Sequence, residues 1–350
     1  MAKRHAIVGF GGMGGWHYEN IRDHVKEIEV VGVWDVREEA REKAVSKGLH
    51  AYSSFEDLLA DDTIDMITIA TPNDFHKDYS IAALRAGKNV ICEKPVTLHS
   101  SELEEVMKVA DETGFLFAVH QNRRWDRDYC IVKKILADNT IGKPYYIETR
   151  VQGARRHLHG WRGYKLNGGG ILLDWGIHLL DQLLMMVDSP VVSVDAHMLH
   201  VYNSEVDDNF KTFLRFENGV SALVEISTNC FISQPRWHIS CEEGTAKIDN
   251  FSCAGEIVRL ISDEMDWADE IVYTDAGPTR TMAPRPKHTM ETLPLPEVET
   301  HWSYYYLNIL DVLDGKAELI VKPEQSLRVM RLTDAIFKCA EQGHGMACRI

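Results

Sequence analysis

The run Ala6-Ile7-Val8-Gly9-Phe10-Gly11-Gly12-Met13-Gly14 decides the fold of the first part of this chain. An apolar strand, 6–8, enters the pattern GxGxxG, and an amphipathic helix is predicted at 16–24. Glycine triplets also occur in ordinary turns, so the pattern takes its meaning from the strand before it and the helix after it. In that setting the glycines let the backbone approach a pyrophosphate at the positive end of the helix. We therefore expect a dinucleotide to contact Gly9, Gly11, Gly12, Met13 and Gly14.

Outward from this run, apolar strands alternate with amphipathic helices. Strands are expected at 6–8, 30–34, 66–70, 89–92 and 115–119, and helices at 16–24, 38–47, 79–86 and 102–112. Apolar strands separated by helices predict a parallel sheet that is covered on both faces, and right-handed crossovers make it doubly wound. We expect an α/β Rossmann domain that binds NAD over residues 1–121.

Asp35 ends the second predicted strand, at the distance from the glycines at which an acidic residue meets the adenosine ribose. Its carboxylate would accept hydrogen bonds from the ribose hydroxyls and repel a 2′-phosphate, which favours NAD over NADP. Arg37 tempers this preference, because an arginine just past the strand can also cover a phosphate. The alternative is that Asp35 is a solvated turn residue.

After about residue 145 the pattern changes to alternation with a period of two. Strands are expected at 145–151, 191–200, 210–216, 220–227, 237–241 and 246–249, with a hairpin turn at Glu217-Asn218-Gly219. Short turns predict antiparallel pairing, so residues 122–350 should form an α+β domain with a large, mainly antiparallel open sheet. An open sheet of this kind favours a homo-oligomer, from dimer to hexamer. We expect an extended loop at 274–296 and helices at 302–313 and 323–341.

Glu93-Lys94-Pro95 follows a predicted parallel strand at its carboxyl end, where open α/β sheets bind ligands. A lysine there can polarise an oxygen beside a bound cofactor, and the proline restricts the chain just after it. The alternative is a surface lysine in a turn.

The segment 168–184 predicts a buried helix, because it is apolar nearly all round. Asp174, His178 and Asp181 fall at i, i+4 and i+7 and would form a polar stripe on one face. Buried polar groups need partners, so the stripe either satisfies itself as a structural Asp–His pair or lines a wet pocket. In the second case His178 can act as a base near neutral pH, and Asp174 can orient or bind a substrate hydroxyl.

A basic island stands out in this acidic chain. It consists of Arg123, Arg124, Arg150, Arg155, Arg156, Arg162 and Lys165. Intramolecular ion pairs, the cofactor pyrophosphate or an acidic substrate would each explain it. The aromatic residues Trp125, Trp161 and Tyr164 can stack on a sugar or pack in the core. His157 and His159 lack carboxylates at metal-ligand spacing, so we expect no metal.

Composition excludes several classes of function. The net charge of −15 disfavours binding to nucleic acid or to an anionic membrane. The seven cysteines are scattered and form no CxxC pair, which indicates reduced thiols. The apolar run at 6–8 is too short for a signal peptide and no other run could span a bilayer, so we expect a cytoplasmic protein.

Together these landmarks resemble the glucose–fructose oxidoreductase / inositol dehydrogenase / rhizopine-catabolism (Gfo/Idh/MocA) family over essentially the whole chain. The resemblance rests on GxGxxG, on Ala70-Thr71-Pro72-Asn73 with His76, on Glu93-Lys94-Pro95 and on the 168–178 segment. It implies that Lys94 and His178 flank the reacting carbinol with Asp174 beside them. It also implies cofactor contacts from Thr71, Asn73, His76, Glu93, Lys94 and Gln121, and from Arg162, which would reach cofactor or substrate. We expect further substrate contacts from Asn122, Arg123, Arg155 and Trp161.

The run 121–126 is similar to a branch with scyllo-inositol dehydrogenases, whereas 161–162, 207–210 and 234–237 look closer to gut-bacterial members that process glycosides, including C-glycosides. The resemblance implies oxidation of a ring hydroxyl, C3–OH of a glucoside, by NAD⁺, with a partner enzyme that cleaves the 3-keto glycoside. Three alternatives stay open. They are an inositol or free-sugar dehydrogenase, a redox-neutral NAD-dependent glycosidase, and a non-catalytic NAD sensor.

Overall fold

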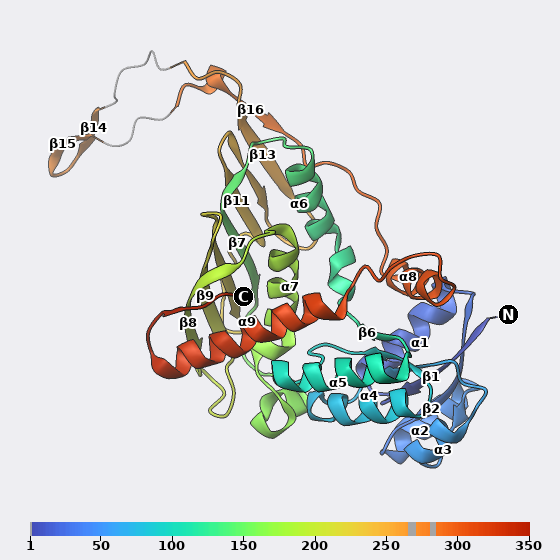
Figure 1. Ribbon diagram of the computed structural model, residues 1–350. Helices are drawn as coiled ribbons and strands as arrows, with labels where there is room; N and C mark the ends of the chain where they lie inside the picture. Colours follow the sequence, from blue (N-terminus) through green and yellow to red (C-terminus); the bar gives the residue numbers. More distant parts are fainter. Residues whose placement is uncertain (1, 265–270, 281–284) are drawn as a thin grey trace.

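The structure is a computed structural model of the 350-residue chain and describes residues 2–264, 271–280 and 285–350. Its first part is a six-stranded parallel sheet with strand order β3-β2-β1-β4-β5-β6 (Figure 1). The strands are β1 (Lys3–Val8), β2 (Ile28–Trp34), β3 (His50–Ala51), β4 (Met66–Ile69), β5 (Asn89–Cys92) and β6 (Phe117–Val119). The order reverses between β1 and β4, which opens a crevice at the carboxyl ends of these strands. The predicted doubly wound Rossmann fold is confirmed.

Five helices connect these strands. They are α1 (Gly12–His24), α2 (Glu38–Ser46), α3 (Phe55–Ala60), α4 (His76–Arg85) and α5 (Ser100–Thr113). Strands β4 and β5 are buried along almost their whole length, as expected of strands covered on both faces. Helix α1 begins within the glycine run itself, so its N-terminus points at the crevice. The sequence did not predict β3 and α3, because two and six residues are too short for a periodic signal.

The rest of the chain builds a nine-stranded sheet in the order β16-β13-β12-β11-β7-β10-β9-β8-β17. Its strands are β7 (Pro144–Gln152), β8 (Val191–Leu199), β9 (Asn209–Phe216), β10 (Ser221–Ser227), β11 (Trp237–Cys241), β12 (Gly244–Ile248), β13 (Gly255–Leu260), β16 (Met290–Leu293) and β17 (Met346–Ala347). Only the β7–β10 pair is parallel. The predicted mainly antiparallel sheet is therefore confirmed.

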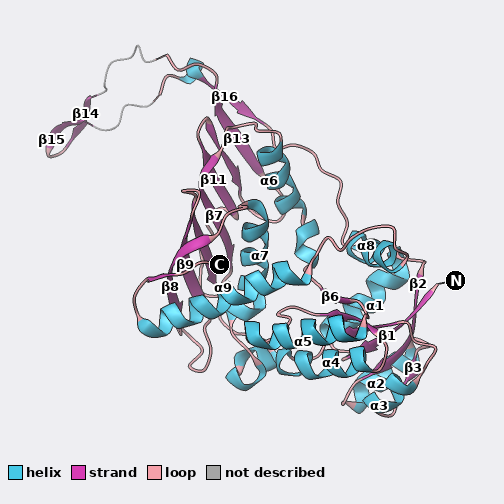
Figure 2. Cartoon of the chain, viewed as in Figure 1, coloured by secondary structure: helices cyan, strands magenta, loops and turns pink. Residues whose placement is uncertain are grey.

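Helices lie across one face of this sheet (Figure 2). They are α6 (Arg127–Ala137), α7 (Ile177–Met186) and α9 (Pro323–Gln342), while α8 (Ser303–Leu313) packs against α1. Helix α9 also packs on α5 and β6 of the first sheet. Helices α8 and α9 thus pack against elements of both parts of the chain. The division into domains 1–121 and 122–350 stays a prediction.

The extended loop expected at 274–296 is wrong in part. Gly277–Arg280 is strand β15, paired with β14 (Ile271–Thr274), and β16 pairs with β13 at one edge of the large sheet. These strands are four residues long, and only their pairing, β14 with β15 in a local hairpin and β16 with β13, makes them strands. Residues 281–284 lie outside the described residues. In the part of the chain that the structure describes, no helix is long and apolar enough to cross a membrane.

Candidate active site

The glycine turn between β1 and α1 requires its glycines for steric reasons. Gly9 has φ +88°, and a Cβ there would lie 2.6 Å from the carbonyl oxygen of Ala70. A Cβ on Gly14 would lie 2.0 Å from the carbonyl oxygen of Gly9. Gly14 therefore serves the packing of α1 on the turn, while the other glycines line the cavity. The N-terminal peptide groups of α1 present a positive end there, which suits a pyrophosphate.

Asp35 lies just past β2 and accepts hydrogen bonds from Phe10 and Arg37. The backbone N–H of Phe10 donates to its Oδ2 at 2.7 Å, and the N–H and Nε of Arg37 donate to its Oδ1 at 2.9 and 3.2 Å. Burial raises the pKa of Asp35, but the Arg37 side chain and the backbone donors outweigh it and leave the pKa below its ordinary value. Asp35 thus stays anionic at the cavity edge, and its carboxylate holds the Arg37 side chain by hydrogen bonds. The residues present fit an NAD molecule.

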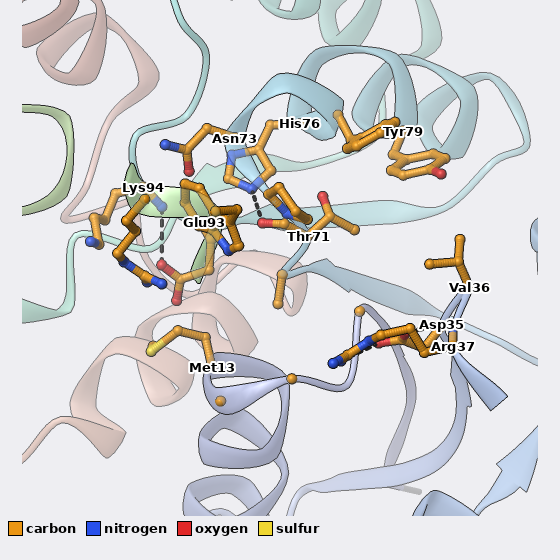
Figure 3. A pocket seen from close by; sticks show the side chains of 18 of the residues that line it. Met13, Asp35, Val36, Arg37, Thr71, Asn73, His76, Tyr79, Glu93 and Lys94 are labelled. Atoms are coloured by element: carbon orange, nitrogen blue, oxygen red, sulfur yellow. Dashed lines mark hydrogen bonds and ion pairs between the residues drawn. The ribbon is translucent and has the colours of Figure 1, made fainter. Parts of the chain in front are cut away.

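One cavity of about 630 Å³ joins these groups to the carboxyl end of β5 in a single crevice, with Asp35 and Arg37 at one end and Lys94 at the other (Figure 3). The residues predicted for the site that line it are Gly9, Gly11, Gly12, Met13, Asp35, Arg37, Thr71, Asn73, His76, Glu93, Lys94, Trp161, Arg162 and Asp174. They come from the carboxyl ends of β1, β2, β4 and β5 and from the segments before α7. Such a long crevice suits an extended dinucleotide.

Two cations meet one carboxylate at the Lys94 end. The Lys94 Nζ lies 2.9 Å from the carbonyl oxygen of Asp174 and 3.3 Å from its Oδ1, and Arg162 Nε donates to the same Oδ1 at 3.0 Å. Burial raises the pKa of Asp174, but Lys94 and Arg162 outweigh it and hold the pKa below its ordinary value. Asp174 is therefore an anion that orients both cations.

The helix expected at 168–184 has an unusual beginning. Leu172–Gly176 is a turn of π-helix that continues into α7, and Asp207 holds its start by accepting the N–H of Leu172 at 2.8 Å. The wide turn places Asp174 towards Lys94. π-Turns inside helices are frequent at functional sites because they redirect side chains in this way.

Of the two interpretations of the stripe formed by Asp174, His178 and Asp181, the self-satisfied Asp–His pair is wrong. Asp181 instead accepts two hydrogen bonds from Arg124, at 2.7 and 2.8 Å, and no hydrogen bond joins His178 to either aspartate among the described residues. The Nδ1 of His178 is buried without a partner. Burial, followed by the charges of Lys94 and Arg123, lowers the pKa of His178 well below its ordinary value, so its imidazole is neutral.

Some predicted residues do not line this cavity. They are Gly14, Gln121, Asn122, Arg123, Arg155 and His178. Gln121 and Asn122 are buried at the end of β6, and Arg155 is exposed. His178 is buried as well, with its ring centroid 6.1 Å from that of Trp175, the residue after Asp174.

Arg123 belongs to a second cavity, of about 510 Å³, which has aromatic walls. Its guanidinium lies 4.1 Å from the centre of the Trp175 ring and 5.9 Å from that of Phe251. Trp125 and Trp302 complete the aromatic lining. Trp175, the residue after Asp174, therefore lines this second cavity, and its ring lies beside that of His178.

Intramolecular ion pairs explain most of the basic island. Arg124 pairs with Asp181, Arg150 with Glu225 at 3.2 Å, and Arg162 with Asp174. Arg123 also pairs with Asp126 at 2.8 Å. Of the three explanations, intramolecular pairing accounts for most of the cluster, and only Arg162 of these arginines lines the first cavity.

Sequence reasoning missed an aromatic wall near Asp35. Trp34, Phe75 and Tyr79 line the first cavity, and the Phe75 and Tyr79 rings are stacked with centroids 5.7 Å apart. Trp34 is the last residue of β2, and Phe75 and Tyr79 lie in the ten residues after β4. These positions could have indicated them, because the ends of both strands border the crevice.

Comparison with known proteins agrees with this arrangement. Residues 3–121 match a model described as an oxidoreductase family with an NAD-binding Rossmann fold, and residues 129–247 match the GFO/IDH/MocA C-terminal domain. The crystal structure of an NAD-binding protein from Listeria innocua is 43% identical, with a TM-score of 0.95 and coverage of 99% of this chain and 100% of that one.

Two curated relatives come from Bacillus subtilis (strain 168). The scyllo-inositol 2-dehydrogenase (NADP(+)) IolW is 26% identical over 342 residues, which cover 96% of this chain and 93% of that protein. The scyllo-inositol 2-dehydrogenase (NAD(+)) is 30% identical over 233 residues, which cover 64% of this chain and 67% of that protein.

Proposed function

Since this chain belongs to the Gfo/Idh/MocA family of oxidoreductases, we propose that it oxidises a ring hydroxyl of a glucoside, the C3 hydroxyl, to the 3-keto glycoside. The coarser activity does not depend on this proposal, because the family and its named members make the protein an NAD-dependent oxidoreductase that acts on a CH–OH group. The observation that carries the proposal is the meeting of Lys94, Asp174 and Arg162 at the end of the cavity opposite Asp35.

Proton removal would involve three residues with different roles, Lys94, Asp174 and His178. A hydroxyl beside Lys94 would lose its proton to the neutral imidazole of His178, whose depressed pKa leaves it unprotonated and able to accept. The Lys94 ammonium would stabilise the negative charge that develops on the oxygen. Asp174 keeps that ammonium in place, and Arg162 donates to the same Oδ1 of Asp174.

NAD⁺, when bound, accepts the hydrogen of the same carbon with both electrons of the C–H bond. The glycine turn, Asp35, Thr71, Asn73 and His76 would hold it, and Gln121 at the end of β6 would lie beside it. The carbinol becomes a ketone, and the proton leaves through His178.

The second cavity supports a substrate larger than a free sugar. It is lined by Arg123, Phe251, Trp302 and Trp175, and Trp175 is the residue after Asp174. Aromatic walls bind flat apolar groups, so this cavity would take the aglycone of a glycoside while its sugar ring lies near Lys94. Asn122 and Arg155 are proposed as further sugar contacts, and Trp161 as a wall of the cofactor cavity beside the sugar.

An inositol or free-sugar dehydrogenase is the second candidate. The names of the two Bacillus subtilis relatives favour it, because both are scyllo-inositol 2-dehydrogenases. Such an enzyme would use the same Lys94 and His178 and would leave the aromatic cavity empty.

The test is NADH absorbance after the protein and NAD⁺ are mixed with a panel of glucosides, inositols and free sugars, while aglycone release is followed in parallel. NADH formed with glucosides and without aglycone is the expected result. NADH formed only with inositols would replace the proposal by the second candidate. Aglycone released without NADH would show a redox-neutral glycosidase and would also overturn the proposal.

A further inference from the structure

A buried chain of hydrogen bonds includes Glu93, the residue before Lys94, and none of its other members stood out in the sequence. It joins Tyr306 of α8, His17 of α1, Glu93 after β5 and His120 after β6. All four side chains are buried. We name them the Glu93 network.

The distances within the Glu93 network are those of ordinary hydrogen bonds. The Tyr306 hydroxyl lies 2.6 Å from His17 Nδ1, and His17 Nε2 lies 2.9 Å from Glu93 Oε1. His120 Nδ1 lies 2.8 Å from the same Oε1. Every contact is satisfied when Tyr306 donates to His17 and both histidines donate to Glu93.

The charge state agrees with these hydrogen bonds. Burial raises the pKa of Glu93, but His120 and His17 outweigh it and hold the pKa well below its ordinary value, so Glu93 is an anion. Burial and then the nearby His17 lower the pKa of His120 to about 4, so His120 is neutral at pH 7. Its Nε2 is buried without a partner, which a neutral ring with its proton on Nδ1 tolerates better than an imidazolium does.

The second oxygen of Glu93 connects the network to the reactive lysine. Glu93 Oε2 accepts the backbone N–H of Lys94 at 3.1 Å, and Lys94 then reaches Asp174. One carboxylate is thereby fixed by α1, by α8 and by the end of β6, and it holds the residue from which the ammonium extends. An unfixed carboxylate would leave that backbone group free to shift, and misplacement by about 1 Å costs orders of magnitude in rate.

We propose that His17, His120 and Tyr306 are positioning residues, which lock Glu93 and through it hold Lys94 against Asp174. The proposal rests on the function proposed for Lys94. It adds that α8, more than 200 positions further along the chain than Lys94, is a part of the reactive site.

A metal ion is the main competing occupant, because one atom from each of His17, Glu93 and His120 lies within 4.8 Å of the others. The sequence predicted no metal. In this geometry both nitrogens already lie at hydrogen-bond distance from one oxygen, and the other Glu93 oxygen is used by Lys94. The described residues offer these three ligands and no fourth from the same set.

Two neighbouring tyrosines supply a matched pair of variants. Tyr305 and Tyr306 are both buried, but only the Tyr306 hydroxyl has a hydrogen-bond partner, since that of Tyr305 has none among the described residues. Tyr306→Phe should therefore lower kcat about tenfold with an unchanged KM for NAD⁺, whereas Tyr305→Phe should leave both unchanged. Equal behaviour of the two variants would overturn the proposal.

The histidines allow rescue by amides that place a donor at the same position. His17→Gln retains a donor towards Glu93 and His17→Leu does not, while His120→Asn and His120→Leu form the corresponding pair. We expect each Leu variant to lose about ten- to a hundredfold in kcat and each amide variant to recover most of it. Loss of thermal stability with an unchanged kcat would show a merely structural role and would overturn the proposal.

A second readout does not require turnover. An amine-reactive ester labels accessible lysines, and mass spectrometry measures the rate at which it labels Lys94. The Lys94 side chain is only 12% exposed while it is held at Asp174. The labelling rate should therefore rise severalfold in Tyr306→Phe and stay unchanged in Tyr305→Phe. If no substrate of the panel reacts, the proposed function fails while this labelling still decides the positioning role. Stoichiometric zinc in the purified protein, with activity lost on chelation, would overturn the proposal in favour of a metal site.

Discussion

Lys94 Nζ lies 3.3 Å from Asp174 Oδ1, although the two residues are 80 positions apart in the chain and follow strands of different sheets. The same carboxylate oxygen accepts Arg162 Nε at 3.0 Å. A single anion thus organises both cations at the inner end of the cofactor cavity. This contact is the structural basis for the role that we propose for Lys94.

Removal of either proposed reactive group should abolish turnover without loss of cofactor. Lys94→Ala and His178→Ala should each lower kcat by about 10²- to 10⁴-fold, because one loses the cation at the oxygen and the other the base. NAD⁺ binding, measured by calorimetry, should persist, since most cavity contacts remain. Lys165→Ala, which removes an exposed lysine of the basic island, is the control. Near-normal turnover in both variants would refute the assignment.

Cofactor preference should depend on Asp35. Asp35→Ser removes the anion that Phe10 and Arg37 hold, so KM for NAD⁺ should rise about tenfold or more as a charge-assisted hydrogen bond to the ribose is lost. KM for NADP⁺ should fall, because Arg37 becomes available to a 2′-phosphate. Steady-state kinetics with both cofactors measure this, with Glu42→Gln at an exposed position of α2 as the control. An unchanged ratio of the two kcat/KM values would contradict the role of Asp35.

The aromatic cavity should matter for the aglycone alone. Phe251→Ala should raise KM for aryl glucosides about tenfold, as a stacked ring is lost, and should leave methyl glucoside unaffected. Phe231→Ala is the matched control, because that phenylalanine is exposed and lies outside the cavity. Equal losses on aryl and methyl glucosides would show that the cavity does not bind the aglycone.

Asp207 should make stability depend on pH. Burial raises its pKa to about 6, so between about pH 4 and pH 6 the folded protein keeps a proton that the unfolded chain releases. Stability therefore falls as pH rises through this window, by at most about 3 kcal/mol, and the loss is complete above it. Asp207→Asn keeps an acceptor for the N–H of Leu172 but has no proton to lose.

The free energy of unfolding of Asp207→Asn, relative to the unchanged protein, should accordingly increase from pH 4 to pH 6 and then level off. Denaturant unfolding at several pH values measures it. Asp195→Asn, at an exposed position of β8, should show no such increase. A pH-independent difference for Asp207→Asn would contradict the raised pKa.

Much of the fold could be predicted because it rests on local patterns. The glycine run, Asp35 and the alternation of strands and helices all lie within short windows, and the first sheet confirms them. Strands β7 to β12 of the second sheet were predicted for the same reason, but β13 and β17 were not. Strands β14, β15 and β16 were not, because four residues carry too little periodicity and their pairing partners decide their state.

The sequence by itself determined the nucleotide fold, its glycine turn and the residue types at the site, since these follow from steric and hydrophobic patterns along the chain. Only the tertiary structure decided which polar groups meet. In the tertiary structure Asp181 binds Arg124, and a π-turn places Asp174 next to Lys94. His17 and His120 both bind Glu93, and Tyr306 binds His17. The physical reason is that a buried polar group takes whichever partner the packing brings within 3 Å or so, and packing depends on residues far apart in the chain.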